Sequence, residues 1–181
     1  MFCERGLWPN IIQLKVENLD SIDLKILSML QEDCKVPQVE LARSVGLSPA
    51  SISERLKRLE KTGIIKSYTA ILDAHGLGID ITAFVFVFVE HPRFEAKLLE
   101  QLRAVPEVLE CHHITGDFSL LLKVRTRNIE TFEHLLFHNI NSIPGVRQTK
   151  TTIVLSSPKE TTHIPMEIPI ESPNDKKDRG E

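Results

Sequence analysis

Cysteine, long apolar runs and secretory signals are scarce in this 181-residue sequence, and each scarcity excludes a class of protein. Its three cysteines are odd in number and far apart, which argues against a disulfide framework or a CxxC metal site. We expect Cys34 and Cys111 to be partly buried. The longest largely apolar run, Ile81 to Val89, is about half of what a membrane span needs. The first residues lack the basic start and apolar stretch of a secretory signal, so we expect a cytoplasmic location and no membrane partner.

The sequence also lacks the short motifs that mark common catalytic and cofactor sites. It contains no P-loop, Rossmann fingerprint, nucleophile elbow or HExxH motif. His112 and His113 are adjacent on a predicted strand, so they face opposite ways and cannot bind one metal together. His134 and His138 share a helical face, but no third ligand accompanies them. We therefore expect neither an enzyme nor a site for a metal or cofactor.

The net charge of −3 does not suggest a nucleic-acid binder, but the charge is unevenly spread. Between Ser48 and Tyr68, five Lys and Arg residues stand against two Glu residues, which leaves a local charge of +3. A face of this segment can therefore attract DNA although the whole chain is acidic.

Three short helices are predicted near the N-terminus. The first is capped at Asp20 or Ser21 and has an apolar stripe of Ile22, Ile26, Leu27 and Leu30. The second begins near Pro37 and ends at Gly46, with inward positions at Val39, Ala42 and Val45. The third opens with the cap Ser48 and Pro49, ends at Gly63, and buries Ile52, Leu56 and Leu59.

Only Gly46 and Leu47 separate the second helix from the cap of the third, which predicts a tight helix-turn-helix. Residues 64–72 are rich in β-branched side chains and predict a strand or wing. We therefore divide the first part of the chain into an arm (1–18), a helix-turn-helix domain (19–72) and a linker (73–80).

The rest of the chain alternates strand and helix patterns. The expected order is strand 81–90, helix 94–105, strand 108–115, a Gly116-Asp117 turn, strand 118–125, helix 129–142 and strand 146–156. This βαββαβ order predicts a ferredoxin-like domain over residues 81–156, and thus an α+β protein. Residues 157–181 form a tail whose polar end we expect to be disordered.

The third helix is the best candidate for reading DNA, because a recognition helix buries one stripe and offers polar and basic residues to the major groove. Its N-terminal residues would meet base edges and its cations would meet phosphates. The alternative is an ordinary amphipathic helix whose polar side faces only solvent. The tight turn before the helix and the predicted wing after it favour the DNA-binding interpretation over this alternative. The candidate DNA-binding residues are Ser48, Ala50, Ser51, Ser53, Glu54, Arg55, Lys57, Arg58, Lys61 and Lys66.

The first strand of the second domain predicts self-association. Alternate residues of a strand point to opposite faces, and both faces of this strand are apolar. Two helices can cover only one face of the sheet, so the other must be buried, most simply against a second subunit. Shielding by the arm or tail is the alternative. We assign dimerisation to Phe84, Val85, Phe86, Val87 and Phe88.

The turn around Gly116 is the candidate effector site. Its exposed N–H groups can hold a carboxylate and an acidic side chain can take an ammonium, as an amino-acid-like effector requires. A plain hairpin turn is the alternative. The candidate residues are Thr115, Gly116, Asp117 and Ser119.

Several motifs in the same order resemble the leucine-responsive regulatory protein and asparagine-regulator (Lrp/AsnC) family of transcriptional regulators. In the first half they are LDSIDLKIL (19–27), VELA (39–42), VGLSP (45–49), RLEKTGII (58–65) and YTA (68–70). In the second half they are PEVLEC (106–111), TGDF (115–118), LLKV (121–124), PGV (144–146) and TKT (149–151).

The resemblance implies dimers that assemble further, often into octamers, with an amino acid bound between dimers that alters assembly or DNA affinity. The family usually carries an aspartate two residues beyond the Gly-Asp pair, where this chain has Ser119. An effector amine would lack that charged partner here. Two alternatives remain: a DNA-organising protein without an effector, and a haem-biosynthesis decarboxylase-like enzyme that acts on a tetrapyrrole through His112 or His113.

Overall fold

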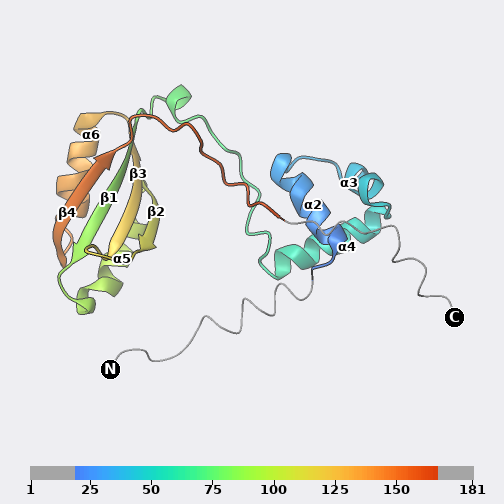
Figure 1. Cartoon of the computed structure of the whole chain (residues 1–181), viewed down its shortest axis with the longest axis horizontal. Helices are drawn as coiled ribbons and strands as arrows, with labels where there is room; N and C mark the ends of the chain where they lie inside the picture. The colour runs from blue at the N-terminus through green and yellow to red at the C-terminus, as the bar shows by residue number, and fades with distance from the viewer. Residues whose placement is uncertain (1–18, 167–181) are drawn as a thin grey trace. The chain divides into compact units, whose positions relative to one another are not determined.

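The computed structural model describes residues 19–166, so the predicted arm and the end of the tail lie outside the described residues. The chain forms two compact units (Figure 1). One holds the described residues up to Ala70 together with those from Thr161 on, and the other is Ile71–Glu160. The segment 161–166, which we had placed in the tail, therefore belongs to the first unit.

The first unit contains the three predicted helices: α2 (Ser21–Glu32), α3 (Gln38–Val45) and α4 (Pro49–Lys61). Asp20 caps α2, Gly46 ends α3 in the left-handed region at φ 71°, and Ser48 caps α4. These local signals explain why each helix begins and ends as the sequence predicts. The buried core of this unit consists of Ile26, Leu41, Ala42, Ile52 and Leu56, joined by partly buried neighbours.

Two local predictions in this unit are wrong. Val39 was expected to face inward but is 58% exposed, and Leu41 takes the buried place on α3. Residues 64–72 form no strand, although their side chains favour one. Strand propensity needs a neighbouring strand to pair with, and the only sheet formed by the described residues is the one in the second unit.

The second unit is a four-stranded antiparallel sheet with helices on one face. Its elements are β1 (Ile81–Val89), α5 (Glu95–Arg103), β2 (Val108–His113), β3 (Leu120–Thr126), α6 (Ile129–His134), η3 (Leu135–Ile140) and β4 (Val146–Ile153). Two short 3-10 turns, η1 (His75–Leu77) and η2 (Pro92–Phe94), precede β1 and α5. The strand order β2-β3-β1-β4 is that of the predicted ferredoxin-like fold.

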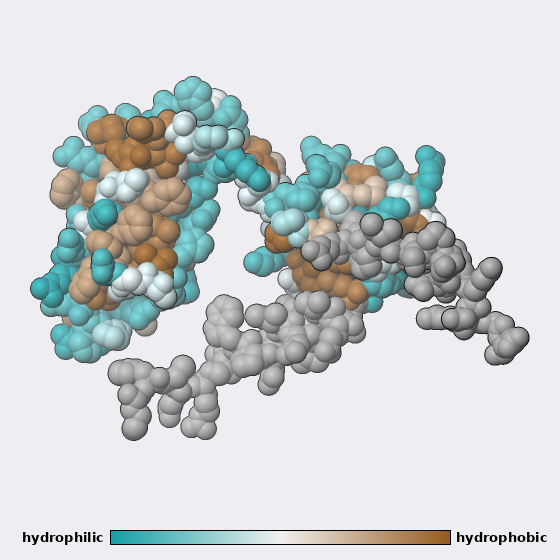
Figure 2. Space-filling view, viewed as in Figure 1, coloured by the Kyte–Doolittle hydropathy of each residue, from teal (hydrophilic) through white to brown (hydrophobic). Residues whose placement is uncertain are grey.

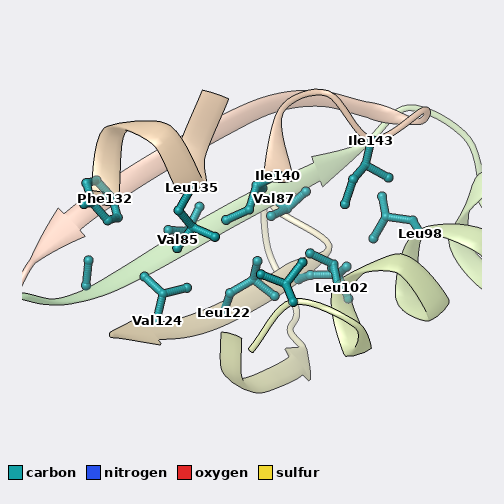
Figure 3. Packing of buried hydrophobic residues seen from close by; sticks show 13 residues of the cluster. Val85, Val87, Leu98, Leu102, Leu122, Val124, Phe132, Leu135, Ile140 and Ile143 are labelled. Carbon is teal, nitrogen blue, oxygen red and sulfur yellow. The ribbon is translucent and has the colours of Figure 1, made fainter. Parts of the chain in front are cut away.

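The core of this unit lies between the sheet and the two helical segments (Figure 3). Val85 and Val87 lie on the core face of β1, Val85 beside Leu135 and Val87 beside Ile140, and both valines are fully buried. They are therefore unavailable to a second subunit, and their assignment to dimerisation is wrong. The open face of β1 carries only the alternate residues, which are half-buried.

The helix predicted over 129–142 changes type midway. It is α-helical to His134 and then widens into the π-helix η3, in which Asn141 N donates to Leu136 O over 2.8 Å. Leu135 and Ile140 are five positions apart and both are buried, and the wider turn brings both onto the core face. A period of 3.6 residues could not predict this change.

The described residues contain neither a helix long and apolar enough to cross a membrane nor a cluster of three metal-binding side chains. Cys34 and Cys111 are exposed free thiols rather than partly buried residues. The rings of His134 and His138 are tilted toward each other with 4.7 Å between centroids, and residues 19–166 supply no third candidate ligand.

Candidate nucleic-acid interface and ligand-binding turn

The N-terminus of α4 is built by a local capping arrangement. The Ser48 hydroxyl accepts a hydrogen bond from Ser51 N over 3.2 Å, and Pro49 occupies the first helical turn, where a missing N–H costs nothing. The buried side of α4 carries Ile52, Leu56 and Leu59 as predicted. The opposite side is therefore free to contact a partner.

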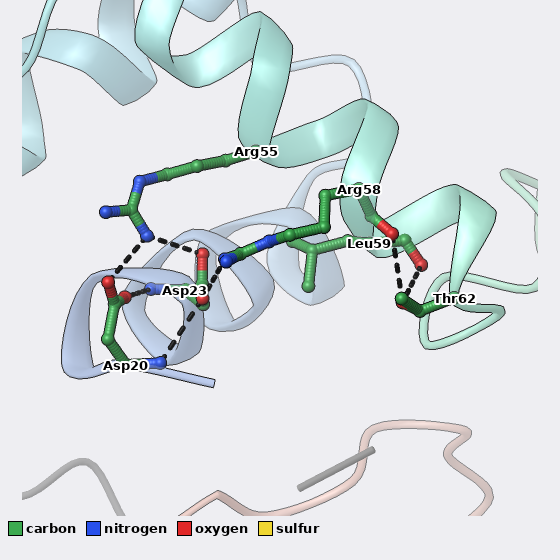
Figure 4. Close-up of polar contacts among 6 residues, drawn as sticks. All are labelled: Asp20, Asp23, Arg55, Arg58, Leu59 and Thr62. Carbon is green, nitrogen blue, oxygen red and sulfur yellow. Dashed lines mark hydrogen bonds and ion pairs between the residues drawn. The ribbon is translucent and has the colours of Figure 1, made fainter. Parts of the chain in front are cut away.

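Two of the predicted phosphate-binding residues make contacts inside the unit (Figure 4). Arg55 Nη1 donates to Asp20 Oδ2 at 2.7 Å and to Asp23 Oδ1 at 2.8 Å, and Arg58 Nη2 pairs with the other oxygen of Asp23. The Asp23 side chain is 0% exposed. Arg55 and Arg58 thus compensate a buried carboxylate and fasten α4 to the start of α2. This supporting role adds to their predicted phosphate contacts, which stay a prediction because both side chains remain partly exposed.

Asp20 and Asp23 also form a reciprocal capping box at the start of α2. Asp23 N donates to Asp20 Oδ1 at 2.8 Å, and Asp20 N donates to Asp23 Oδ2 at 3.2 Å. Burial opposes ionisation of Asp20, but the Asp23 N–H and the Arg55 guanidinium outweigh it and lower the pKa of Asp20. Sequence reasoning missed Asp23, although the three-residue spacing of the two aspartates is the signature of such a box.

The remaining predicted DNA-binding residues stand on the accessible side of the unit. Ser51 and Ser53 are half-buried, while the others are exposed: Ser48, Ala50, Glu54, Lys57, Lys61 and Lys66. Ser51 and Glu54 line a surface hollow of about 390 Å³ together with Leu47, Arg55 and Arg58. The helix therefore presents hydroxyl, carboxylate and ammonium groups on one side, which are the groups that contact base edges and phosphates.

The predicted effector turn is a six-residue loop between β2 and β3 rather than a two-residue hairpin. Ile114 N donates to Ser119 O at 3.1 Å and Ser119 N donates to Val87 O at 3.0 Å, so the base of the loop is fixed. The backbone N–H groups of residues 115–118 donate to no other described residue. Gly116 has φ 115°, a region that favours glycine, and Asp117 is exposed.

Ser119 differs from the other residues of the loop. Its hydroxyl accepts from Val89 N over a long 3.4 Å contact, so its side chain leans toward β1. Ser119 is half-buried whereas Thr115 and Asp117 are exposed. The loop thus offers backbone N–H donors to the carboxylate of a ligand. Its own carboxylate, Asp117, can accept from the amine of that ligand.

The open face of the sheet combines apolar and charged side chains. The rings of Phe86 and Phe118 contact each other in a tilted arrangement with 5.8 Å between centroids, and Phe84 and Phe88 lie on the same side of β1 as Phe86. Lys123, opposite Phe84 in the register, and Arg125 both bind Glu160, at 2.5 and 2.6 Å. Figure 2 shows hydrophobic side chains gathered on the visible surface of this unit. Residue 160 thus reaches one part of the face that we expected a second subunit to cover.

Comparison with known proteins assigns both units. Residues 82–164 match the model of the Lrp/AsnC ligand binding domain, and residues 19–66 match a winged helix-turn-helix DNA-binding domain. The HTH-type transcriptional regulator FL11 of Pyrococcus horikoshii is 40% identical over 148 residues, which cover 82% of this chain and 97% of that protein. The leucine-responsive regulatory protein of Salmonella typhimurium is 38% identical over 82% of this chain and 92% of its own.

The chain belongs to the Lrp/AsnC family. This Lrp/AsnC protein is a transcriptional regulator with a helix-turn-helix DNA-binding domain and a ferredoxin-like ligand-binding domain. The resemblance inferred from its motifs is confirmed, and so is the predicted fold class. The winged type of the first domain follows from the family match, although residues 64–72 contain no strand.

Solved structures of other family members support the Lrp/AsnC assignment. A transcriptional regulator from Neisseria meningitidis, crystallised as a complex with L-Met, superposes with a TM-score of 0.78 at 34% identity over 82% of this chain and 97% of its own. Escherichia coli AsnC superposes with a TM-score of 0.76 at 30% identity over 80% and 97%.

Proposed function

We propose that this Lrp/AsnC regulator binds specific DNA sequences by placing α4 in the major groove. The observation that carries the proposal is the division of α4 into a fully apolar buried stripe and an accessible side with hydroxyl and ammonium groups. Ser51, Ser53 and Glu54 are positioned to contact base edges, and Lys57, Lys61 and Lys66 to contact phosphates. Arg55 and Arg58 hold the helix in place through Asp23 of α2.

The protein acts as a dimer in this proposal, and dimers assemble further into octamers. The open sheet face carries the dimer contact through Phe84, Phe86 and Phe88, which the helices of their own subunit leave uncovered. A twofold dimer presents two copies of α4 to successive major grooves.

An amino acid bound at the loop 115–119, where subunits meet, regulates this assembly. Its carboxylate would accept from the loop N–H groups and its ammonium would face Asp117. The L-Met complex of the Neisseria regulator supports an amino acid as ligand class. Ligand binding changes DNA affinity to the extent that it favours one assembly over another.

Lys57→Ala is expected to weaken binding to a mixed-sequence duplex and to reduce the slope of log affinity against log salt by about two for each bound dimer, because each of the two copies of α4 loses one phosphate contact and about one released counterion. Fluorescence anisotropy over a salt series measures both quantities. Lys97→Ala removes a cation that is also exposed, from α5, and serves as the matched control. An unchanged slope in the Lys57 variant would contradict the placement of α4.

The effector is tested by a thermal-shift screen of the proteinogenic amino acids on the purified protein. A ligand that binds the folded state raises the melting temperature, and the rise grows with the logarithm of the ligand concentration once that concentration exceeds Kd. Asp117→Ala should abolish the shift, and Ser119→Asp should enlarge it by adding a second charge for the ammonium. If no amino acid shifts either the wild type or the Ser119→Asp protein, the effector-independent DNA organiser replaces this part of the proposal.

A further inference from the structure

The helix-turn-helix unit contains a groove with apolar and polar lining, and the proposed DNA contacts use only Ser53 and Lys57 of that lining. It has a volume of about 350 Å³ and takes apolar side chains from all three helices, among them Leu30, Leu41 and Leu56. Tyr68 forms one wall, held by a 3.0 Å hydrogen bond from its hydroxyl to Glu60 Oε1 on α4. Burial, and next the bond to Glu60, raises the pKa of Tyr68 to about 12, so the wall stays neutral.

A late segment of the chain is fastened next to this groove. The Gln31 side chain bonds Ile164 in both directions: Gln31 Nε2 donates to Ile164 O at 3.0 Å, and Ile164 N donates to Gln31 Oε1 at 2.7 Å. His163 Nε2 lies 3.3 Å from Glu32 Oε1. These two anchors stand on α2 between Leu30 and Cys34, which both line the groove.

The sequence that follows the anchor has the pattern of an extended segment with one apolar side. Apolar residues alternate at Ile164, Met166, Ile168 and Ile170, and alternate side chains of an extended chain point the same way. Pro165 and Pro169 have no N–H group that would need a partner in an apolar site. Ile164 is 68% exposed whereas Met166 is half-buried.

We propose that residues 166–170 bind in this groove of the same chain. The seven residues from Ile164 to Ile170 span about 20 Å when extended, which is long enough for a groove that begins beside Gln31. Burial of two or three apolar side chains is the driving force. Lys57 also lines the groove, so the bound segment carries the acidic Glu167 to the edge of the surface proposed to bind DNA.

The thiol of Cys34 is a natural reporter of this occupancy, because it lines the groove and is exposed. We would replace Cys3 and Cys111 by serine in the full chain and measure the rate at which a thiol reagent modifies Cys34. Ile168→Ser with Ile170→Ser should raise the rate about five-fold, since the protecting segment would no longer dock. The control Lys176→Ser with Lys177→Ser changes the tail further along and should leave the rate unchanged.

Equal rates in the isoleucine variant and its parent would overturn the proposal. A cross-link identifies which chain supplies the segment: Ile168→Cys in the same background should form a disulfide with Cys34 under mild oxidation. A disulfide within one chain, seen as an unchanged mass on a non-reducing gel, supports the proposal. A disulfide between chains would overturn it in favour of the partner's tail. Neither result depends on DNA or effector binding, so both are separate from the tests of the proposed function.

Discussion

Gly145→Ala is expected to destabilise the sheet unit by about 3 kcal/mol or more, since overpacking and a left-handed backbone strain act together. An added Cβ would lie 2.3 Å from Phe94 Cβ and 2.8 Å from its Cγ, at a residue with φ 98°. Gly145 cannot retreat freely, because its carbonyl accepts from Glu90 N at 2.8 Å. Urea unfolding followed by circular dichroism measures the loss.

Gly116→Ala is the matched control for this substitution. Gly116 has a similarly positive φ of 115°, but an added Cβ there meets no atom within 4 Å. The control therefore isolates the backbone strain, which costs about 1 to 3 kcal/mol. If both variants lose the same free energy of unfolding, the close contact with Phe94 does not contribute to the cost of an alanine at position 145.

Arg55→Ala combined with Arg58→Ala is expected to cost the helix-turn-helix unit about 3 kcal/mol, because it leaves the buried Asp23 carboxylate without its cations. Arg58 is half exposed, so water can partly replace it, which keeps the expected loss at the lower end of such cases. Thermal unfolding measures the effect. Lys57→Ala with Lys61→Ala removes the same charge from exposed positions of the same helix and should stay within about 0.5 kcal/mol.

The loss of stability at acidic pH provides a second measure of the ion pairs between Asp20, Asp23 and the two arginines. The folded state lowers the pKa of Asp20, so its contribution to stability is present above the ordinary value of 3.8 and is lost as the pH falls through the folded value. The double arginine variant lacks the Arg55 guanidinium and should lose less stability over this acidic window than the wild type. An equal acid dependence in both proteins would contradict the ion pairs of Asp20.

The sequence predicts those features of the fold that depend on near neighbours. The caps at Asp20 and Ser48 and the stop at Gly46 are read from adjacent residues, and all three are where the structure has them. The π-helix is not predictable in this way, because it depends on how Leu135 and Ile140 meet the sheet.

The candidate sites show the same limit. Arg55 and Arg58 look like DNA contacts in the sequence, but their partner Asp23 stands 32 and 35 positions away and is found only in the fold. Alternation along β1 separates Val85 and Val87 from the phenylalanines, yet it does not say which side the helices cover. Phenylalanine and valine are both apolar, so each could face the helices of its own subunit or the open side of the sheet.

The division of the chain also fixes an order of events during synthesis. The ribosome releases α2, α3 and α4 first, then the whole of Ile71–Glu160, and only afterwards the residues from Thr161 on. The bonds between Gln31 and Ile164 join residues 133 positions apart, so they form after the intervening unit has emerged. The first unit of this protein to appear is therefore the last to be completed.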